Sequence, residues 1–177
     1  MEFGLTSRVI ERAKINKLEP IKEIDYRFIW EVNYANICGK MLLIIVNPDT
    51  RYSMIYCDLK PSVWKHLDNF LHQAVEHAFL NEGFSFTEIN TYFKLAGEVK
   101  LTKTHGKKSM GGMNHLTTYL SYYEKILVDG MYQKLITDDF NTDLCNVALH
   151  PECKYIEPKE FFVKRMKELI SENNLIN

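Results

Sequence analysis

The chain has 177 residues and a formal net charge of -1, a length that suits one hydrophobic core and is too short for two comfortable domains. The near-neutral charge excludes a protein that binds nucleic acid or anionic lipid over its whole surface, because such binding draws on many cationic groups together. A partner of that kind must be held by a local patch. We expect one domain over residues 1–177, with an N-terminal arm or helix (1–20), a core (26–130), and an irregular segment followed by a C-terminal helix (131–177).

Targeting and redox signals point to the cytoplasm. Residues 1–17 mix charges of both signs without a continuous apolar run, so they do not form a signal peptide. The longest apolar run, residues 41–46, is far too short to span a bilayer, and we expect no membrane partner. The cysteines have no CxxC pair, which favours reduced thiols. They are Cys38, Cys57, Cys145 and Cys153.

The first half of the core predicts an antiparallel meander. Residues 26–34 alternate apolar and polar side chains, which is the period of a strand buried on one face. Gly39-Lys40 supplies a tight connection to the apolar strand 41–46. Asn47-Pro48-Asp49-Thr50 is a strong turn signal, and a third strand over 52–58 should return from it.

Helices should follow the meander. Pro61 suits a first helical turn, and apolar residues recur at helical spacing in one long helix, Pro61 to Glu82. Ser85 to Glu88 has the form of a capping box ahead of a shorter helix that Gly97 ends. A fourth strand is expected over residues 99–104.

The rest of the chain predicts two more helices around an irregular stretch. One helix should follow the basic loop, Asp138 to Pro151 should be irregular, and Pro158 should start the final helix. These elements predict an α+β fold with a mainly antiparallel sheet of about four strands and helices packed chiefly on one face.

The stretch from Glu98 to Asn114, EVKLTKTHGKKSMGGMN, concentrates the site-like chemistry. Lysines crowd around Gly106, and a helix that starts near Ser109 would direct backbone amides toward an anion. Arg51 completes the cationic pocket if the sheet brings it near. The predicted ligand-binding residues are Arg51, Lys103, Thr104, Lys107, Lys108, Ser109 and Asn114.

Two alternatives explain the same residues without a ligand. A solvated basic turn needs Ser109 only as a helix cap, and Arg51 pairs equally well with Asp49 or a neighbouring carboxylate. The GKKS sequence lacks the spacing of a P-loop, which disfavours an NTPase.

Other candidate chemistry is weaker. His72 and His77 are one residue too far apart for the HEXXH metal motif. Cys145, His150 and Cys153 supply only three soft ligands, one short of a structural zinc site. We therefore expect no metal and no cofactor. Tyr119 and Tyr123 share a helical face, where base stacking and core or dimer packing are both open.

Four segments in a fixed order resemble a family of small uncharacterised bacterial and mobile-element proteins, known only as a domain of unknown function and sometimes fused to a plasmid-type open-reading-frame domain. The segments are VNPDTRYS (46–53), LDNFLHQAVEHAFLNEG (67–83), AGEVKLTKT (96–104) and SMGGMN (109–114). The family commonly has arginine where Lys108 stands and a small polar residue where His105 stands. The resemblance implies one compact α/β domain and no established activity.

Together these features favour binding over catalysis. The leading hypothesis is a non-catalytic protein of mobile-element or host-conflict type that recognises nucleic acid or a protein through the basic loop and Arg51. One alternative is a small hydrolase or transferase that acts on a phosphorylated substrate in the same pocket. Another is a homodimeric protein-protein interaction module.

Overall fold

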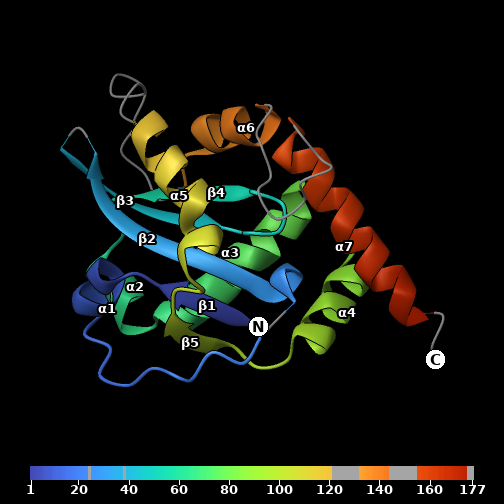
Figure 1. Cartoon of the computed structure of the whole chain (residues 1–177), viewed down its shortest axis with the longest axis horizontal. Helices are drawn as coiled ribbons and strands as arrows, with labels where there is room; N and C mark the ends of the chain where they lie inside the picture. The colour runs from blue at the N-terminus through green and yellow to red at the C-terminus, as the bar shows by residue number, and fades with distance from the viewer. Residues whose placement is uncertain (24, 38, 121–131, 144–154, 175–177) are drawn as a thin grey trace.

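The computed structural model describes residues 1–23, 25–37, 39–120, 132–143 and 155–174. In this part of the chain, five strands form one mixed sheet with the order β4-β3-β2-β1-β5 (Figure 1). The strands are β1 (Glu2–Leu5), β2 (Ile29–Ile37), β3 (Lys40–Val46), β4 (Ser53–Cys57) and β5 (Lys100–Lys103).

The predicted meander is confirmed. β2 pairs antiparallel with β3, and β3 pairs antiparallel with β4, so the apolar strand β3 lies between two partners. Gly39 has a φ of 80° in the β2–β3 connection, a conformation that glycine adopts without steric cost. A short 3-10 helix, η1 (Tyr26–Phe28), occupies the residues where the first strand was expected to begin.

β1 is a fifth strand that falls within the expected N-terminal arm. Phe3 and Leu5 enter the main core, whereas Glu2 and Gly4 alternate with them and face the other side of the sheet. β1 pairs parallel with both β2 and β5, because the helix α1 (Ser7–Ala13) carries the chain across between β1 and β2. The sheet is therefore less antiparallel than the sequence suggested.

The helices cover both faces of the sheet unequally, and the α+β class is confirmed. The larger core contains side chains from five helices, namely α1, α2 (Pro61–Lys65), α3 (Leu67–Asn81), α4 (Phe86–Ala96) and α7 (Pro158–Asn174). The smaller core, on the opposite face, is closed by α5 (Lys107–Leu120) and α6 (Lys134–Thr142). Figure 1 shows α5 crossing the strands on the side away from α3. None of the described helices has the length and apolarity needed to cross a membrane.

Three helix predictions need correction. The helix expected over residues 61–82 is broken at His66, whose φ of -131° and ψ of 48° are not helical. α5 begins at Lys107, so Ser109 lies inside its first turn instead of capping it. α6 includes Asp138 to Thr142, which were expected to be irregular; residues 144–151 lie outside the described part. The capping box at Ser85 and Glu88 is present as predicted.

Candidate functional site

Two of the segments that carry the family resemblance meet in space. The side chain of Arg51 lies across α5, and its Nη1 donates to the backbone oxygen of Ser109 at 3.4 Å. A Cβ at Gly112 would overlap Nη1 and stand only 2.6 Å from Cδ of Arg51, whereas one at Gly111 would lie 3.5 Å from Nη2. The second glycine of the SMGGMN segment is therefore what lets the arginine cross the helix.

The turn before β4 presets the position of Arg51. Its φ of 67° is left-handed, a conformation that costs a non-glycine residue about 1–3 kcal/mol and persists only where the surroundings enforce it. Asn47 provides that enforcement. Its backbone oxygen accepts from the amide of Arg51 at 2.8 Å, its Oδ1 accepts from the amide of Thr50 at 3.0 Å, and its Nδ2 donates to the oxygen of Ile29 at 2.9 Å.

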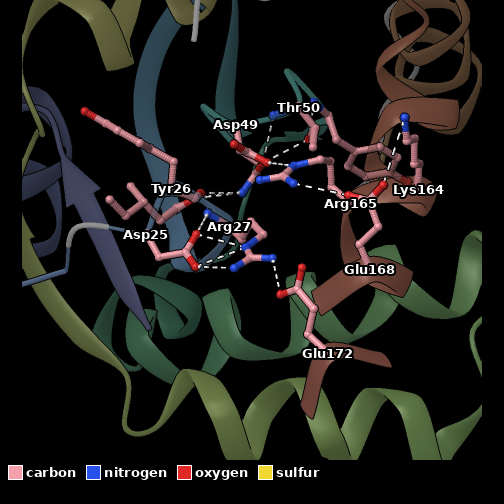
Figure 2. Close-up of polar contacts among 12 residues, drawn as sticks. Asp25, Tyr26, Arg27, Asp49, Thr50, Lys164, Arg165, Glu168 and Glu172 are labelled. Atoms are coloured by element: carbon pink, nitrogen blue, oxygen red, sulfur yellow. Dashed lines mark hydrogen bonds and ion pairs between the residues drawn. The ribbon is translucent and has the colours of Figure 1, made fainter. Parts of the chain in front are cut away.

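The same turn is attached to the C-terminal helix through ion pairs. Figure 2 shows Asp49 facing Arg165 of α7, with 2.9 Å between Oδ2 and Nε. Arg165 also reaches Glu168 on its own helix, and Arg27 of η1 pairs with Glu172 at 3.2 Å. Asp49, considered from the sequence as a partner for Arg51, thus has a role in fixing the turn to α7.

A cavity of about 310 Å³ lies beside Arg51. This half-open cavity is lined by residues of α5, α6, β3 and β4, by Asp143 after α6, and by Tyr155 and Pro158 at the start of α7. Its polar lining includes Arg51, Ser53, His115 and Asp143, and its apolar lining includes Leu116 and Phe140. Arg51 is buried, with 7% of the residue exposed, so the cavity places an arginine with little access to solvent beside apolar side chains.

Beneath the basic loop, four buried side chains form a hydrogen-bonded cluster. His105 bridges two carboxylates, with Nδ1 at 3.1 Å from Oε1 of Glu31 and Nε2 at 3.1 Å from Oε2 of Glu2. Ser109 donates its hydroxyl to the same Oε1 of Glu31 at 2.5 Å, and the backbone amide of His105 does so at 2.9 Å. The cluster joins β1, β2 and the start of α5.

Glu31 occupies the position at which an external anion was expected. Its carboxylate is fully buried at the N-terminus of α5, where the helix dipole favours negative charge. Burial opposes the charged form of His105, but the hydrogen bonds to Glu31 and Glu2 outweigh it and raise the pKa of His105 above its ordinary value of 6.5. Gly4 makes room for the cluster, since a Cβ there would overlap Oε2 of Glu31 and lie 2.8 Å from Nδ1 of His105.

The exposed part of the basic stretch itself carries lysines and no acidic residue. From Val99 to Tyr123 the sequence contains no aspartate or glutamate, and its lysines are Lys100, Lys103, Lys107 and Lys108. The last three are exposed, at the end of β5 and in the first turn of α5. The compensating carboxylates lie inside, on Glu2 and Glu31.

Comparison with known proteins assigns the family. The profile of a domain of unknown function, DUF6933, matches residues 2–161. The chain belongs to the DUF6933 family. No functionally curated protein matches it. The DUF6933 match extends from β1 into α7, and so it contains Arg51, the glycine pair and the buried cluster.

The structure separates the predicted site residues of this DUF6933 protein into two groups. Arg51 and Ser109 are buried, and Thr104 is half-buried. Lys103, Lys107, Lys108 and Asn114 are exposed. Asn114 lines a different cavity, of about 390 Å³, together with Thr117, Thr118 and residues at the start of α1.

Several residues of the site were not predicted. Glu31 was assigned to the solvent-facing side of its strand, and Glu2 to an arm outside the sheet. Alternation of Glu2 and Gly4 with apolar neighbours was the signal that could have revealed a strand there. Nothing in the spacing of the sequence indicates that Asp143 and Arg51 line the same cavity.

Predictions about metals and thiols are tested only in part. Within the described residues, no group of three or more His, Cys, Asp or Glu side chains is arranged to hold a metal ion. His72 and His77 instead pack on the rings of Phe93 and Tyr132. Cys57 is a buried free thiol. Of the cysteines, histidines and tyrosines considered from the sequence, the following lie outside the described part of the chain: Cys38, Tyr122, Tyr123, Cys145, His150 and Cys153.

Proposed function

We propose that this DUF6933 protein is a non-catalytic binding protein that recognises nucleic acid through the surface at the start of α5. The observation that carries the proposal is the exposure of Lys103, Lys107 and Lys108 within a stretch of sequence that has no acidic residue. Phosphate neutralisation by such groups supplies sequence-independent affinity for nucleic acids. The family resemblance suggests a mobile-element or host-conflict setting for this activity, and the cysteine pattern favours the cytoplasm.

The position of two of the lysines supports an anionic partner. Lys107 and Lys108 lie in the first turn of α5, where the positive end of the helix dipole disfavours cations. A phosphate bound to the two ammonium groups would relieve that repulsion from the solvent side, while Glu31 provides the negative charge on the buried side. The buried Glu31 holds this turn in place through Ser109 and the amide of His105, so the lysines are presented from an ordered base.

Neighbouring polar groups extend the same surface. Asn114, Thr117 and Thr118 of α5 line a cavity that also includes Ser7 and Arg8 at the start of α1. Hydroxyl, amide and guanidinium groups are the side chains that commonly contact sugar and phosphate. Lys103 is the residue of β5 that pairs with Leu5 of β1, immediately before the start of α1. These groups would contact the sugar-phosphate backbone of a nucleic acid as it continues from the lysines across the edge of the sheet.

The experiment is fluorescence anisotropy with labelled single- and double-stranded DNA and RNA at low salt. The double substitution Lys107→Ala/Lys108→Ala should weaken binding about tenfold or more, and to the same extent for unrelated sequences, because phosphate contacts carry no base information.

The matched control is Lys65→Ala/Lys94→Ala. It removes the same charge from exposed positions on α2 and α4, helices that pack on the other face of the sheet. At about 0.1 M salt its affinity should stay within about twofold of wild type, because charges farther from the bound phosphates than the screening length of about 10 Å contribute little. Equal losses in both variants would reduce the effect to net charge and contradict a site at α5. No binding by the wild type to any of the nucleic acids would favour a protein partner instead.

A further inference from the structure

We infer that the cavity beside Arg51 binds a small organic anion, a carboxylate or a phosphate monoester with an apolar body. This site is separate from the nucleic-acid surface, because Lys103 and Lys107 do not line it. The inference therefore stands or falls independently of the proposed function.

The first support is the fixed guanidinium. Arginine offers a planar fork of donors that matches the two oxygens of a carboxylate or phosphate. The backbone of Arg51 is held in a left-handed conformation by the Asn47 turn, and its side chain packs across Gly112. Because the backbone and the side-chain conformation of Arg51 are already fixed, little conformational entropy is lost when an anion binds to it.

The second support is the composition of the cavity wall. Leu116 and Phe140 provide apolar surface, while Ser53 and His115 add polar groups near the cation. Small-molecule sites typically combine a predominantly apolar lining with a few fixed polar groups. Asp143 also lines the cavity and would repel a second negative charge unless the ligand offers it a donor. The lining thus selects a ligand with one anionic head and a compact body.

The volume limits the ligand further. At about 310 Å³, the cavity lies at the lower end of the range for ligand sites, which runs from about 300 to 1,000 Å³. A single ring that bears one acidic group fits this size, whereas a dinucleotide does not. Phenyl phosphate and benzoate are therefore suitable probes, because they share the ring and differ only in the anionic head.

Adjacent glycines offer a matched pair of variants. Gly112→Ala introduces a methyl group into the space of the Arg51 side chain, whereas Gly111→Ala places the same group at an ordinary contact distance of 3.5 Å. Both substitutions favour the helix, and at Gly112 this gain offsets part of the cost of pushing the Arg51 side chain aside. Only Gly112→Ala should displace the guanidinium from the cavity wall.

Isothermal titration calorimetry with phenyl phosphate, benzoate and the neutral benzamide tests the inference. At least one of the two anions should bind wild type, and benzamide should bind about tenfold more weakly or worse, since it lacks the charge that strengthens the hydrogen bonds to Arg51. Gly112→Ala and Arg51→Met should each weaken anion binding about tenfold or more. Gly111→Ala should weaken it by a smaller factor, because Gly111 also lines the cavity but its methyl group would lie at contact distance from Arg51 without overlapping it. Comparison of the two anions identifies the preferred head group.

Three results would overturn the inference. The first is that neither anion binds at about 10 mM, a concentration well above the dissociation constant expected for a preformed site. The second is that benzamide binds as tightly as the anions. The third is that Gly112→Ala binds the anions with the affinity of wild type. Thermal melting of each variant, recorded in parallel, verifies that a loss of affinity does not reflect unfolding.

Discussion

His105 links two strands of the sheet through its two ring nitrogens. Carboxylates accept hydrogen bonds, so contacts at both Nδ1 and Nε2 require the doubly protonated ring. The side chains of Glu2 and Glu31 are 2% and 0% exposed, which makes the imidazolium the group that permits two negative charges to be buried so close together. The basic loop is thus supported from below by its own internal salt bridge.

The raised pKa of His105 predicts a specific pH dependence of stability. A group whose folded pKa lies above its unfolded value contributes stability that is complete below the unfolded pKa and is lost as the pH rises through the folded pKa. The contribution of this group to the free energy of unfolding should therefore be complete below about pH 6.5 and should decrease as the pH rises from there through the raised folded pKa. The difference between wild type and His105→Gln should be greatest at the acidic end of this transition.

Urea denaturation at several pH values measures this difference, with His66→Gln as the control because His66 is exposed between α2 and α3. The control should follow the wild-type pH profile. A gap between wild type and His105→Gln that is constant over the whole range would show that His105 does not titrate in the folded protein as its contacts imply.

Gly4 allows a second prediction at the same scale. Gly4→Ala forces a methyl group against the carboxylate of Glu31 and the ring of His105, and overpacking of this kind costs about 1–3 kcal/mol. Gly39→Ala is a poor control because its φ is positive, but Gly111→Ala places a methyl group at an ordinary contact distance of 3.5 Å from Arg51. Equal urea midpoints for Gly4→Ala and wild type would mean that the cluster is looser than the contacts indicate.

Elements with strong local signals were predictable from the sequence. The turn at Asn47, the capping box at Ser85 and the proline start of α7 each depend on residues within a few positions of one another. β1 was missed because a four-residue strand contains only two periods of alternation, and its pairing partners lie far along the chain. The break between α2 and α3 at His66 likewise has no proline or glycine to announce it.

The candidate site was only half predictable for the same reason. Lysines around Gly106 are visible in the sequence, and the structure shows three of them exposed. The burial of Ser109 depends on Glu31, which reaches it from a strand 78 positions earlier in the chain. The Arg51 cavity depends on Asp143, a residue of the connection after α6. Contacts between such distant positions follow from packing and leave no periodic signal.

Docking of α3 is the prediction that belongs to the scale of elements. Leu71 is fully buried in the main core, on the helical face expected from its spacing. Leu71→Ala should lower the free energy of unfolding by about 2–5 kcal/mol, from lost transfer energy and the cavity left behind. Phe86→Ala, at a position 69% exposed, should change it by less than about 0.5 kcal/mol. Similar urea midpoints for the two variants would contradict the docked face.

At the scale of the molecule, the large hydrophobic core and the proposed recognition surface lie on opposite faces of the sheet. One face of the sheet carries the large core built from five helices, and the other carries a smaller core under α5 and α6. The net charge of -1 conceals a local excess of cations at the start of α5, since the acids nearest to it are folded inside. A near-neutral protein can therefore present a basic surface without being basic overall.

The salt dependence of nucleic-acid binding is the most direct test of the proposal that the lysines at the start of α5 bind phosphates. If Lys103, Lys107 and Lys108 each neutralise a phosphate, a plot of log Kd against log salt concentration should be steep for wild type. The triple alanine variant should reduce the slope by about two to three units, near 0.7–0.9 for each lysine. A wild-type slope that the triple variant leaves unchanged would contradict recognition of phosphates at the start of α5.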